Sequence, residues 1–432
     1  MSAPDAGGAI ARARQMDGAD PLRPLRERFE IPRGTDGASV AYFCGNSLGL
    51  MPAGARAAVR QELDDWATLG VEGHMEGRTP WFSYHEVFRD MGARLVGARP
   101  GEVVMMNSLT VNLHLMMVSF YRPQGSRRRI LIEDDAFPSD SYAVQSQLRL
   151  HGIEPDEGLI RLKPRAGERA LRTSDVTSAI RDRRDELALA LLPGVSYLTG
   201  QVFDRQAISA AAREAGVAIG WDLAHAAGNI PMKLHDWGPD FACWCSYKYV
   251  NAGPGAVAGC FVHERHGRRA DLPRFAGWWG NDPATRFQMK PDFAPRPGAD
   301  GWQLSNPPIL AMAPLKASLE IFDEVGMEAL RAKSRRMTAF LADLLEGLPG
   351  VEIITPPDTE TGAFDGPAGG RGCQLSIRLP GADARAIHGE LKRRGVICDF
   401  REPDIIRAAP VPLYNRFEDC VRLADEIARQ TA

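Results

Sequence analysis

The residues with the clearest chemical potential lie at the ends of apolar, strand-like runs. Lys248 follows the run FACWC in the stretch WCSYKYVNAGPG, with Tyr247 beside it and a Gly-Pro-Gly turn after it. Asp222 and His225 follow an earlier run of the same kind, VAIGWD. A single lysine at a strand end usually extends to solvent, and a single aspartate there usually caps a helix. A lysine and a carboxylate at neighbouring strand ends, however, could act on one substrate.

The chemistry that this pair favours is that of pyridoxal 5′-phosphate (PLP). PLP forms a Schiff base with a lysine amine, and an aspartate that keeps its ring nitrogen protonated makes the ring an electron sink. Asp222 could hold that proton, because a charge pair at ~4 Å and an effective dielectric of ~20 is worth about 4 kcal/mol. Ser108-Leu109-Thr110, at an expected helix start, offers hydroxyl and backbone N–H groups to the phosphate. Phe137, at another strand end, is placed to cover the ring face.

Alternating helical and strand patterns would position these groups. Strands are expected at 102–106, 129–135, 187–193, 217–222 and 241–246, and helices at 86–97, 108–121, 139–152 and 204–216. Apolar strands that are separated by helices indicate a parallel sheet covered on both faces. Ligands of such sheets bind beyond the carboxyl ends of the strands. The sequence therefore predicts an α/β fold with Lys248 and Asp222 at the ligand-binding edge.

A smaller domain is expected after this sheet. Helical periodicity extends over 313–348, and short strands at 351–355, 373–379 and 396–400 surround a helix at 383–395. We therefore predict a large domain at 76–311 and a small C-terminal α/β domain at 312–432. The Pro/Gly-rich stretch 356–372 is expected to be a loop. The segment 1–75 is expected to be irregular and to pack on the small domain and the active site.

Composition and charge exclude several classes of protein. The 432 residues are 44% hydrophobic and 25% charged, which is ordinary for a globular chain, and the formal net charge of −3 gives no sign of binding to nucleic acid or a membrane surface. No apolar stretch reaches the ~18 residues of a spanning helix, and residues 1–20 lack the core of a signal peptide, so we expect a cytoplasmic protein. The seven cysteines are expected to be reduced, because their number is odd and no CxxC pair occurs. Cys243-x-Cys245 lacks a second pair that would complete a zinc site, so no metal is expected.

Seven short stretches resemble those of kynureninases, in the same order along the chain. They are FCGNSLGL, AFPSD, WDLAHAAG, SYKYVNAGPG, WWGND, LSNPPIL and RAAPVPLYN. Kynureninases are fold-type I PLP enzymes related to aspartate aminotransferase. The resemblance therefore implies a mainly parallel large domain, a smaller α/β domain, PLP as cofactor and a homodimer. It also implies hydrolysis of L-kynurenine, and of 3-hydroxykynurenine as a second candidate substrate, to L-alanine and anthranilate or its 3-hydroxy form, in tryptophan degradation or NAD synthesis.

The same resemblance implies roles for individual residues. Lys248 would carry PLP covalently, Tyr247 would contact the phosphate and assist proton transfer, and Asp222 would pair with the ring nitrogen. The other cofactor contacts would come from Leu109, Thr110, Phe137, Pro138, Ser139, Asp140 and His225 and, across the dimer interface, from Trp278 and Asn306. The substrate would meet Arg407, whose guanidinium suits a bidentate contact with the α-carboxylate, together with Ser47, His74 and Asn306.

Some alternatives remain open in the sequence. Trp279 could take the place of its neighbour Trp278, and Pro193 stands where relatives often have a hydroxyl that could contact the phosphate. Another fold-type I PLP enzyme is a rival, although a desulfurase would need a reactive cysteine on a loop such as 356–372, which has none. The stretch GPGAVAG resembles a dinucleotide loop only loosely, because a strand-like run follows it. A protein that binds PLP without catalysis is a third alternative.

Overall fold

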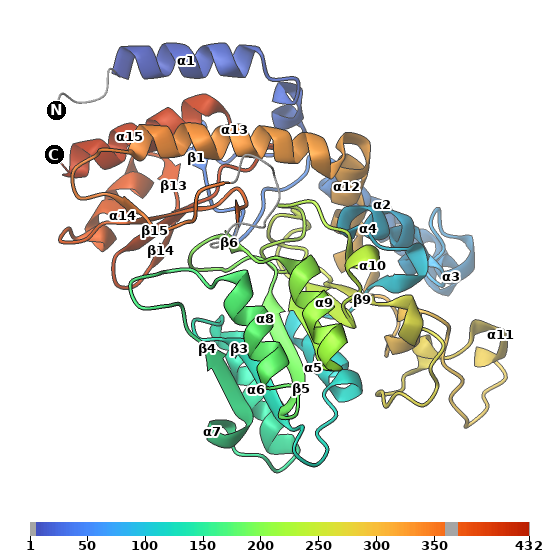
Figure 1. The fold of residues 1–432 in the computed structure, drawn as a ribbon. Helices are drawn as coiled ribbons and strands as arrows, with labels where there is room; N and C mark the ends of the chain where they lie inside the picture. Colours follow the sequence, from blue (N-terminus) through green and yellow to red (C-terminus); the bar gives the residue numbers. More distant parts are fainter. Residues whose placement is uncertain (1–5, 359–369, 432) are drawn as a thin grey trace.

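A seven-stranded sheet forms the centre of the larger part of the chain (Figure 1). The computed structural model describes residues 6–358 and 370–431. The strand order is β2 (Val103–Met105), β9 (Gly259–Val262), β8 (Phe241–Trp244), β7 (Ala218–Asp222), β5 (Leu187–Pro193), β3 (Arg129–Glu133) and β4 (Leu159–Leu162). The pairs from β8 to β4 are parallel, whereas β9 is antiparallel to both β8 and β2. The predicted, mainly parallel α/β sheet is confirmed, with β9 as its one reversed strand.

Helices cover both faces of this sheet because successive strand residues point to opposite faces. In β5, Leu189 and Leu191 belong to one buried cluster, and Ala190 and Leu192 belong to another. Helices α5 (Leu109–Phe120) and α6 (Pro138–Leu150) pack on the first cluster. Helices α4 (Arg89–Val96), α8 (Thr173–Asp182) and α9 (Arg205–Ala215) pack on the second. Short helices α3 (Gly73–Glu76), α7 (Pro155–Gly158), α10 (Leu234–Trp237) and α11 (Pro283–Arg286) lie in the connections.

The C-terminal part contains a second, antiparallel sheet with helices beside it. The strand order is β10 (Glu352–Ile353), β12 (Leu375–Arg378), β15 (Ile405–Ala408) and β14 (Asp399–Arg401). The helical pattern expected over 313–348 is divided between α12 (Ile309–Val325) and α13 (Met327–Leu345), because Gly326 lies between them at φ 78°. The remaining helices are α14 (Ala384–Arg393) and α15 (Phe417–Thr431).

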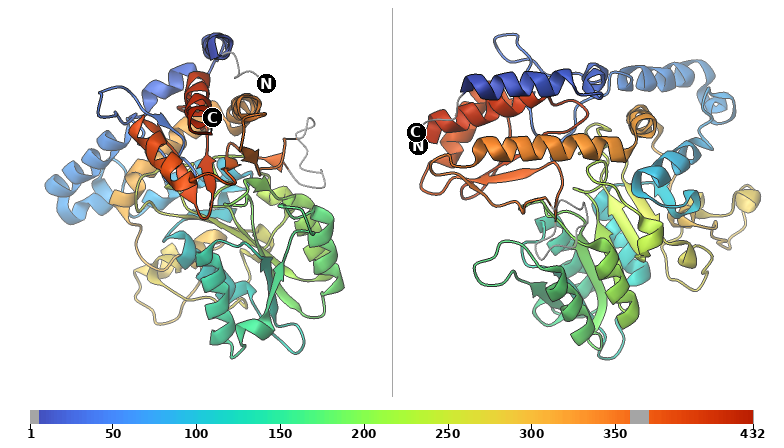
Figure 2. Two further views of the ribbon diagram at one scale, coloured as in Figure 1. Left: turned by 90° about the vertical axis from the view of Figure 1, so that its left-hand side faces the viewer. Right: turned by 45° about the horizontal axis from the view of Figure 1, so that its top comes forward.

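The prediction that segment 1–75 is irregular was wrong. It contains α1 (Ala6–Gly18), α2 (Ala55–Leu69) and the short strand β1 (Ala41–Tyr42), which pairs in parallel with β13 (Val396–Ile397). Figures 1 and 2 show α1 lying beside α15. The carboxylate of Asp17 accepts the N–H groups of Phe417 and Glu418 at the start of α15, at 2.8 and 3.1 Å. These contacts hold a helix whose own sequence, with three glycines and few large apolar residues, is weakly patterned.

Most of the expected loop 356–372 lies outside the described residues, which resume at 370. There, β11 (Gly370–Arg371) pairs with β6 (Gln201–Val202) of the larger part. All seven cysteines are buried free thiols, as expected. Across residues 6–358 and 370–431, no helix is long and apolar enough to cross a membrane.

Candidate active site

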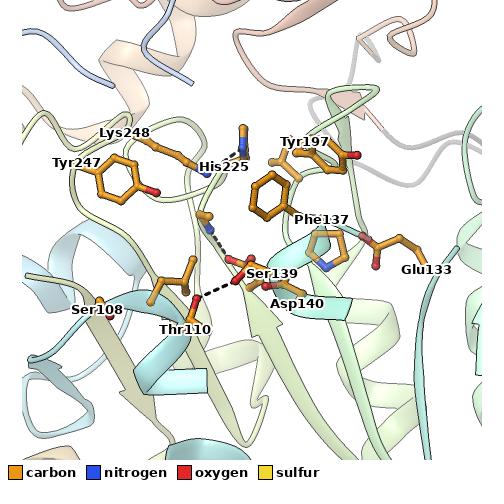
Figure 3. A pocket seen from close by; sticks show the side chains of 15 residues that line it. Ser108, Thr110, Glu133, Phe137, Ser139, Asp140, Tyr197, His225, Tyr247 and Lys248 are labelled. Carbon is orange, nitrogen blue, oxygen red and sulfur yellow. Dashed lines mark hydrogen bonds between the residues drawn. The ribbon is translucent and has the colours of Figure 1, made fainter. Parts of the chain in front are cut away.

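A cavity of about 170 Å³ lies at the carboxyl ends of β3, β5, β7 and β8 (Figure 3). Its position agrees with the edge at which ligands of parallel α/β sheets bind. It is lined by Ser108, Leu109, Thr110, Glu133, Phe137, Ser139, Asp140, Pro193, Val195, Tyr197, Asp222, Ala224, His225, Tyr247 and Lys248. Ten of the residues predicted from the sequence to hold PLP, with Ser108 among them, are therefore brought to one cavity.

Two neighbouring strands bring Asp222 and Lys248 to this cavity. Asp222 is the last residue of β7 and lies opposite Cys243 of β8, which leads directly to Lys248. The Nζ atom of Lys248 is 3.1 Å from Nε2 of His225. The carboxylate of Asp222 accepts the N–H of Ala224 at 2.7 Å, which fixes its orientation at the strand end. The parallel pairing of β7 and β8 thus accounts for the proximity that the sequence predicted.

The backbone after Lys248 turns sharply and is held by the N-terminal segment. Asn251 has a positive φ of 56°, and its N–H bonds to the carbonyl of Lys248 at 2.9 Å. Gly49, in the stretch NSLGL, donates its N–H to the carbonyl of Tyr247 at 2.8 Å. A Cβ atom at Gly49 would lie 2.3 Å from the carbonyl oxygen of Lys248, so only glycine allows this approach. The contact explains why NSLGL and SYKYVNAGPG occur together.

Hydroxyl groups gather where helices α5 and α6 begin. Ser108 precedes α5 in an extended conformation, and Thr110 lies in its first turn. Pro138 begins α6, and Ser139 follows it. The hydroxyl oxygens of Thr110 and Ser139 are 2.9 Å apart, so one hydrogen bond joins the two helix starts (Figure 3). Free N–H groups and hydroxyls at a helix start suit a phosphate.

An aromatic pair covers one side of the cavity. The ring of Phe137 packs edge-on against Tyr197, with ring centres 5.2 Å apart. Lys248 Nζ lies 5.7 Å from the centre of the Phe137 ring. Phe137 therefore presents a ring face to the space beside the lysine amine, which is where a flat cofactor ring would stack.

Burial changes the protonation of several groups around the cavity. Burial, followed by the nearby carboxylate of Asp222, raises the pKa of Asp140 well above its usual range. Burial also raises the pKa of Glu133 to about 8. The pKa of His225 is lowered well below its usual range by burial and by the charge of Lys248, so this imidazole is neutral at neutral pH. Burial and the neighbouring Cys245 raise the pKa of Tyr247, which keeps its phenol protonated.

Six residues predicted from the sequence lie outside the cavity lining, and one of them, Pro138, stands between the lining residues Phe137 and Ser139. Arg407 is buried in β15 and donates from Nη1 to the carbonyl of Tyr197 at 2.5 Å, so it adjoins the cavity through Tyr197. His74 packs against Phe82, which stacks on Trp279. The others are exposed: Ser47, Asn306 and Trp278.

The two adjacent tryptophans differ in their surroundings. Trp279 is fully buried and donates its Nε1–H to Nδ1 of His85 at 3.3 Å. Trp278 is 40% exposed and packs edge-on against Phe287. Of the two tryptophans, Trp278 therefore presents part of its ring to the surface, whereas Trp279 does not.

Several cavity residues were missed by the analysis of the sequence: Glu133, Val195, Tyr197 and Ala224. Glu133 ends β3 as Asp222 ends β7, so the same strand-end rule would have found it. Val195 and Tyr197 lie in the loop after β5, and no pattern in the sequence marks them. Pro193 ends β5 opposite Asp222, so it lies beside the carboxylate of Asp222. The hydroxyls expected to bind the phosphate lie elsewhere, at the starts of α5 and α6.

The residues of the cavity fit PLP. The lysine amine, the strand-end carboxylate, the ring face of Phe137 and the hydroxyls at two helix starts match its aldehyde, ring nitrogen, ring and phosphate. Among the residues that line the cavity, Nδ1 of His225 is also buried without a hydrogen bond to the described residues. A polar group of the cofactor or substrate could bond to this atom.

Comparisons with known proteins identify the relatives of the chain. A sequence model described as "Aminotransferase class-V" matches residues 50–364, and one described as "Kynureninase C-terminal domain" matches residues 330–427. Among curated proteins, a kynureninase of Myxococcus xanthus is 57% identical over 95% of this chain and 94% of its own. A kynureninase of Xanthomonas campestris is 55% identical over 96% and 97%, and one of Koribacter versatilis is 53% identical over 94% of each chain.

Solved structures with the same fold are more distant in sequence. A mutant of the cystine lyase C-DES, with glycine linked covalently to its PLP cofactor, has a TM-score of 0.76 at 19% identity and covers 93% of this chain and 98% of its own. The cysteine desulfurase CsdA of Escherichia coli has a TM-score of 0.75 at 17% identity, over 95% of this chain and 98% of its own. Likeness at this identity shows the fold alone. The match over nearly the whole chain to the curated proteins is far stronger, and it shows that the chain belongs to the kynureninase family.

Proposed function

We propose that this chain is a PLP-dependent kynureninase that hydrolyses L-kynurenine to anthranilate and L-alanine at the cavity around Lys248. The observation that carries the proposal is the meeting of Lys248 and Asp222 at neighbouring strand ends, facing the hydroxyls of two helix starts. The 53–57% identity to curated kynureninases over nearly the whole chain supports this reaction rather than that of a desulfurase or an aminotransferase.

The residues of the cavity would hold the cofactor in one orientation. Lys248 would carry it covalently, Asp222 would keep its ring nitrogen protonated, and Phe137 would stack on the ring with His225 nearby. Its phosphate would be bound by Thr110, Ser139, the N–H groups of Leu109 and Thr110, and Tyr247. When bound, PLP supplies an electron sink for the charge that develops at the substrate Cα.

The chain's own groups would then move protons and position the substrate. Freed from the cofactor by the substrate's amine, Lys248 would take the proton from Cα, and Arg407 would hold the α-carboxylate. Water would add to the γ-carbonyl, and cleavage of the Cβ–Cγ bond would release anthranilate and leave the bond's electron pair on Cβ. A proton taken up at Cβ, the net second hydrogen of the water, would then allow the remaining three carbons to leave as alanine. Because its pKa is raised, the phenol of Tyr247 would stay protonated, so it could donate a hydrogen bond to the carbonyl oxygen during this addition and would not act as the base.

The proposal is tested by adding L-kynurenine to purified protein that shows the visible absorbance of bound PLP, and following anthranilate by its fluorescence. We expect anthranilate and alanine to form in equal amounts. A protein that binds PLP and leaves kynurenine intact would be a different PLP enzyme or a binding protein. Repeating the assay with 3-hydroxykynurenine measures which of the two substrates the pocket prefers.

Replacing Thr110 with valine should weaken PLP binding without changing the shape of the pocket. The substitution removes one hydroxyl from the phosphate, and a hydrogen bond to a charged group is worth about 1.5–3 kcal/mol, so the dissociation constant should rise roughly 10- to 100-fold. Titration of the cofactor-free protein with PLP measures the change. Ser146→Ala, which removes a hydroxyl bonded within α6, is the matched control and should bind PLP normally. Equal affinity of Thr110→Val and this control would remove Thr110 from the phosphate site.

The proposed active form is a homodimer with Trp278 and Asn306 contributed to the partner's site. Apolar side chains are exposed around Trp278, including Phe287 and Met289, and others lie along α2 and α3, including Trp66 and Met75. A self-complementary contact would remove such surface from water.

Mixing two inactive variants tests this shared site. A dimer of one Lys248→Ala subunit and one Trp278→Ala subunit would have one site with both residues intact. After unfolding and refolding of an equal mixture, activity should recover to roughly a quarter of that of the unmodified enzyme. The variants refolded separately are the control. No recovery, with hybrid dimers demonstrated by mass, would place Trp278 in the site of its own subunit.

The proposed cellular location, pathway and domain division of the enzyme are as follows. The enzyme would be cytoplasmic, as its seven reduced thiols suggest, and would act in tryptophan degradation or NAD synthesis. We divide the chain at 76 and 312 into an N-terminal segment, a large cofactor-binding domain and a small domain. The packing of Ala41 and Phe43 in the same buried cluster as Leu375 and Ile406 supports docking of the N-terminal segment on the small domain.

A further inference from the structure

Arg407 is held by the protein at both ends of its guanidinium group. Its side chain is 1% exposed, within β15. Nη1 donates to the carbonyl of Tyr197 at 2.5 Å, and Nη2 donates to the carboxylate of Asp399. The third nitrogen, Nε, is buried and has no hydrogen-bond partner within the described residues. A buried donor without a partner is costly, and because Arg407 adjoins the cavity through Tyr197, a carboxylate bound there could satisfy it.

The partner Asp399 is placed by the register of the small sheet. Asp399 of β14 lies directly opposite Arg407 of β15, so their side chains are cross-strand neighbours. The carboxylate of Asp399 is 13% exposed and also meets Nη2 of Arg401 at 3.1 Å. Asp399 therefore supplies the charge that allows Arg407 to remain buried when no substrate carboxylate is present.

The other anchor of Arg407 connects it to the cavity. The carbonyl of Tyr197 also accepts Nε2 of Gln374 at 3.1 Å, so two side chains of the small domain converge on it. The ring of Tyr197 lines the cavity and packs against Phe137. Holding Nη1 on this carbonyl keeps the guanidinium beside the cavity wall.

We infer that Asp399 is a positioning residue for substrate binding: it fixes one end of the Arg407 guanidinium, so that Nε and the remaining N–H bonds stay available to the carboxylate of the amino-acid substrate. The inference rests on the proposed role of Arg407 as the group that binds this carboxylate. A flexible arginine would lose side-chain entropy on binding, whereas an anchored one has already lost it. The contribution of Asp399 should therefore appear in ligand affinity.

The chain offers a matched control for this experiment. Asp404 is bonded to Nε of Arg378 at 2.9 Å, and its side chain is 16% exposed, close to that of Asp399. Arg378 belongs to β12 of the same sheet and Asp404 directly precedes β15, but neither residue lines the cavity or bonds to Arg407. Asp404→Ala thus removes an arginine-bonded aspartate of similar burial, although its arginine partner is more exposed than Arg407, without touching the proposed site.

The holoenzymes of Asp399→Ala, Asp399→Asn and Asp404→Ala are to be compared in two assays. The first measures KM and kcat for L-kynurenine. The second measures dissociation constants from the change in cofactor absorbance on titration with L-alanine, which has a carboxylate, and with ethylamine, which has none. Thermal unfolding and retained PLP absorbance establish that each variant is folded.

For Asp399→Ala we expect KM and the L-alanine dissociation constant to rise about tenfold or more, with kcat changed less than about threefold. The reason is that Arg407 would hold the carboxylate equally in the bound substrate and in the transition state, so loosening Arg407 weakens binding without slowing the chemical step. Asp399→Asn keeps an oxygen acceptor and should lie between this variant and the unmodified enzyme. Ethylamine should bind all variants alike, and Asp404→Ala should match the unmodified enzyme. If Asp399→Ala does not fold, the shift in Asp399→Asn decides the question.

Three results would overturn the inference. Asp399 variants with the same KM and L-alanine affinity as Asp404→Ala would show no positioning, and tighter L-alanine binding would make Asp399 a competitor of the substrate. Equal weakening of ethylamine would show general damage to the site. Arg407→Gln distinguishes the proposed role of Arg407 from the inferred role of Asp399. If Arg407→Gln leaves L-alanine binding unchanged, the proposed role of Arg407 fails. If L-alanine binding weakens in Arg407→Gln but not in the Asp399 variants, only the role of Asp399 is rejected.

Discussion

Replacing Lys248 with alanine should abolish the visible absorbance of covalently held PLP and reduce kcat about 10⁴-fold or more. The substitution removes both the amine that would carry the cofactor and the base that would take the Cα proton. Absorbance of the purified protein and the rate of anthranilate release measure the two effects separately. No other lysine lines the cavity, so the described residues offer no substitute amine there.

Lys392→Ala is the control for this experiment. Lys392 is an exposed residue of α14 in the small domain, so its loss should leave both the spectrum and the rate unchanged. Added methylamine or a similar small amine should partly restore proton transfer in Lys248→Ala. A Lys248→Ala protein that retains the bound-cofactor spectrum and normal turnover would overturn the proposed role of Lys248.

Replacing Asp222 with asparagine should lower kcat/KM about 10³-fold. Asparagine keeps the size of the side chain and removes the charge that would hold the ring nitrogen protonated, and such a charge pair is worth about 4 kcal/mol. The effect should appear mainly in kcat, because proton removal from Cα depends on a protonated ring. Steady-state kinetics and the pH dependence of the cofactor spectrum measure it.

Two further variants define what Asp222 contributes. Asp222→Glu keeps the charge and should recover part of the activity, while Asp236→Asn, an exposed change in α10, should have no effect. The neighbouring Asp140, whose pKa is raised, cannot replace the lost charge because burial favours its neutral form. Activity of Asp222→Asn within tenfold of the unmodified enzyme would show that another group protonates the ring.

Much of the fold and of the cofactor site could be predicted because the signals are local. Fully apolar strands such as 187–193 indicate a buried parallel sheet, and the residues that follow such strands must meet at one edge. This rule alone brought Asp222, His225 and Lys248 together. Helix starts were predicted at Ser108 and Ser139, one residue from the observed starts, and the hydroxyls there line the cavity.

The elements that were not predicted depend on distant contacts. Helix α1 is stabilised by its packing on α15 and by Asp17, and its own sequence gives little sign of it. Strand β9 is reversed because the chain returns beside β8 after the turn that holds Lys248, which local pattern cannot reveal. Tyr197 joins the cavity only because the loop after β5 is bonded to the small domain through Gln374 and Arg407.

The sequence by itself determined the class of fold, the cofactor chemistry and the residues that would perform this chemistry. These could be predicted because strand ends, helix starts and family motifs are recognisable in short stretches of the chain. Only the tertiary structure decided which of two adjacent tryptophans is buried and which carboxylate faces Arg407. Those facts depend on packing and strand register between segments that are far apart in the sequence. Trp279 is enclosed by His85 and Phe82, and Asp399 meets Arg407 because β14 and β15 pair in one register. Side-chain contacts of this kind are set when the chain folds, by the burial of each group against its neighbours.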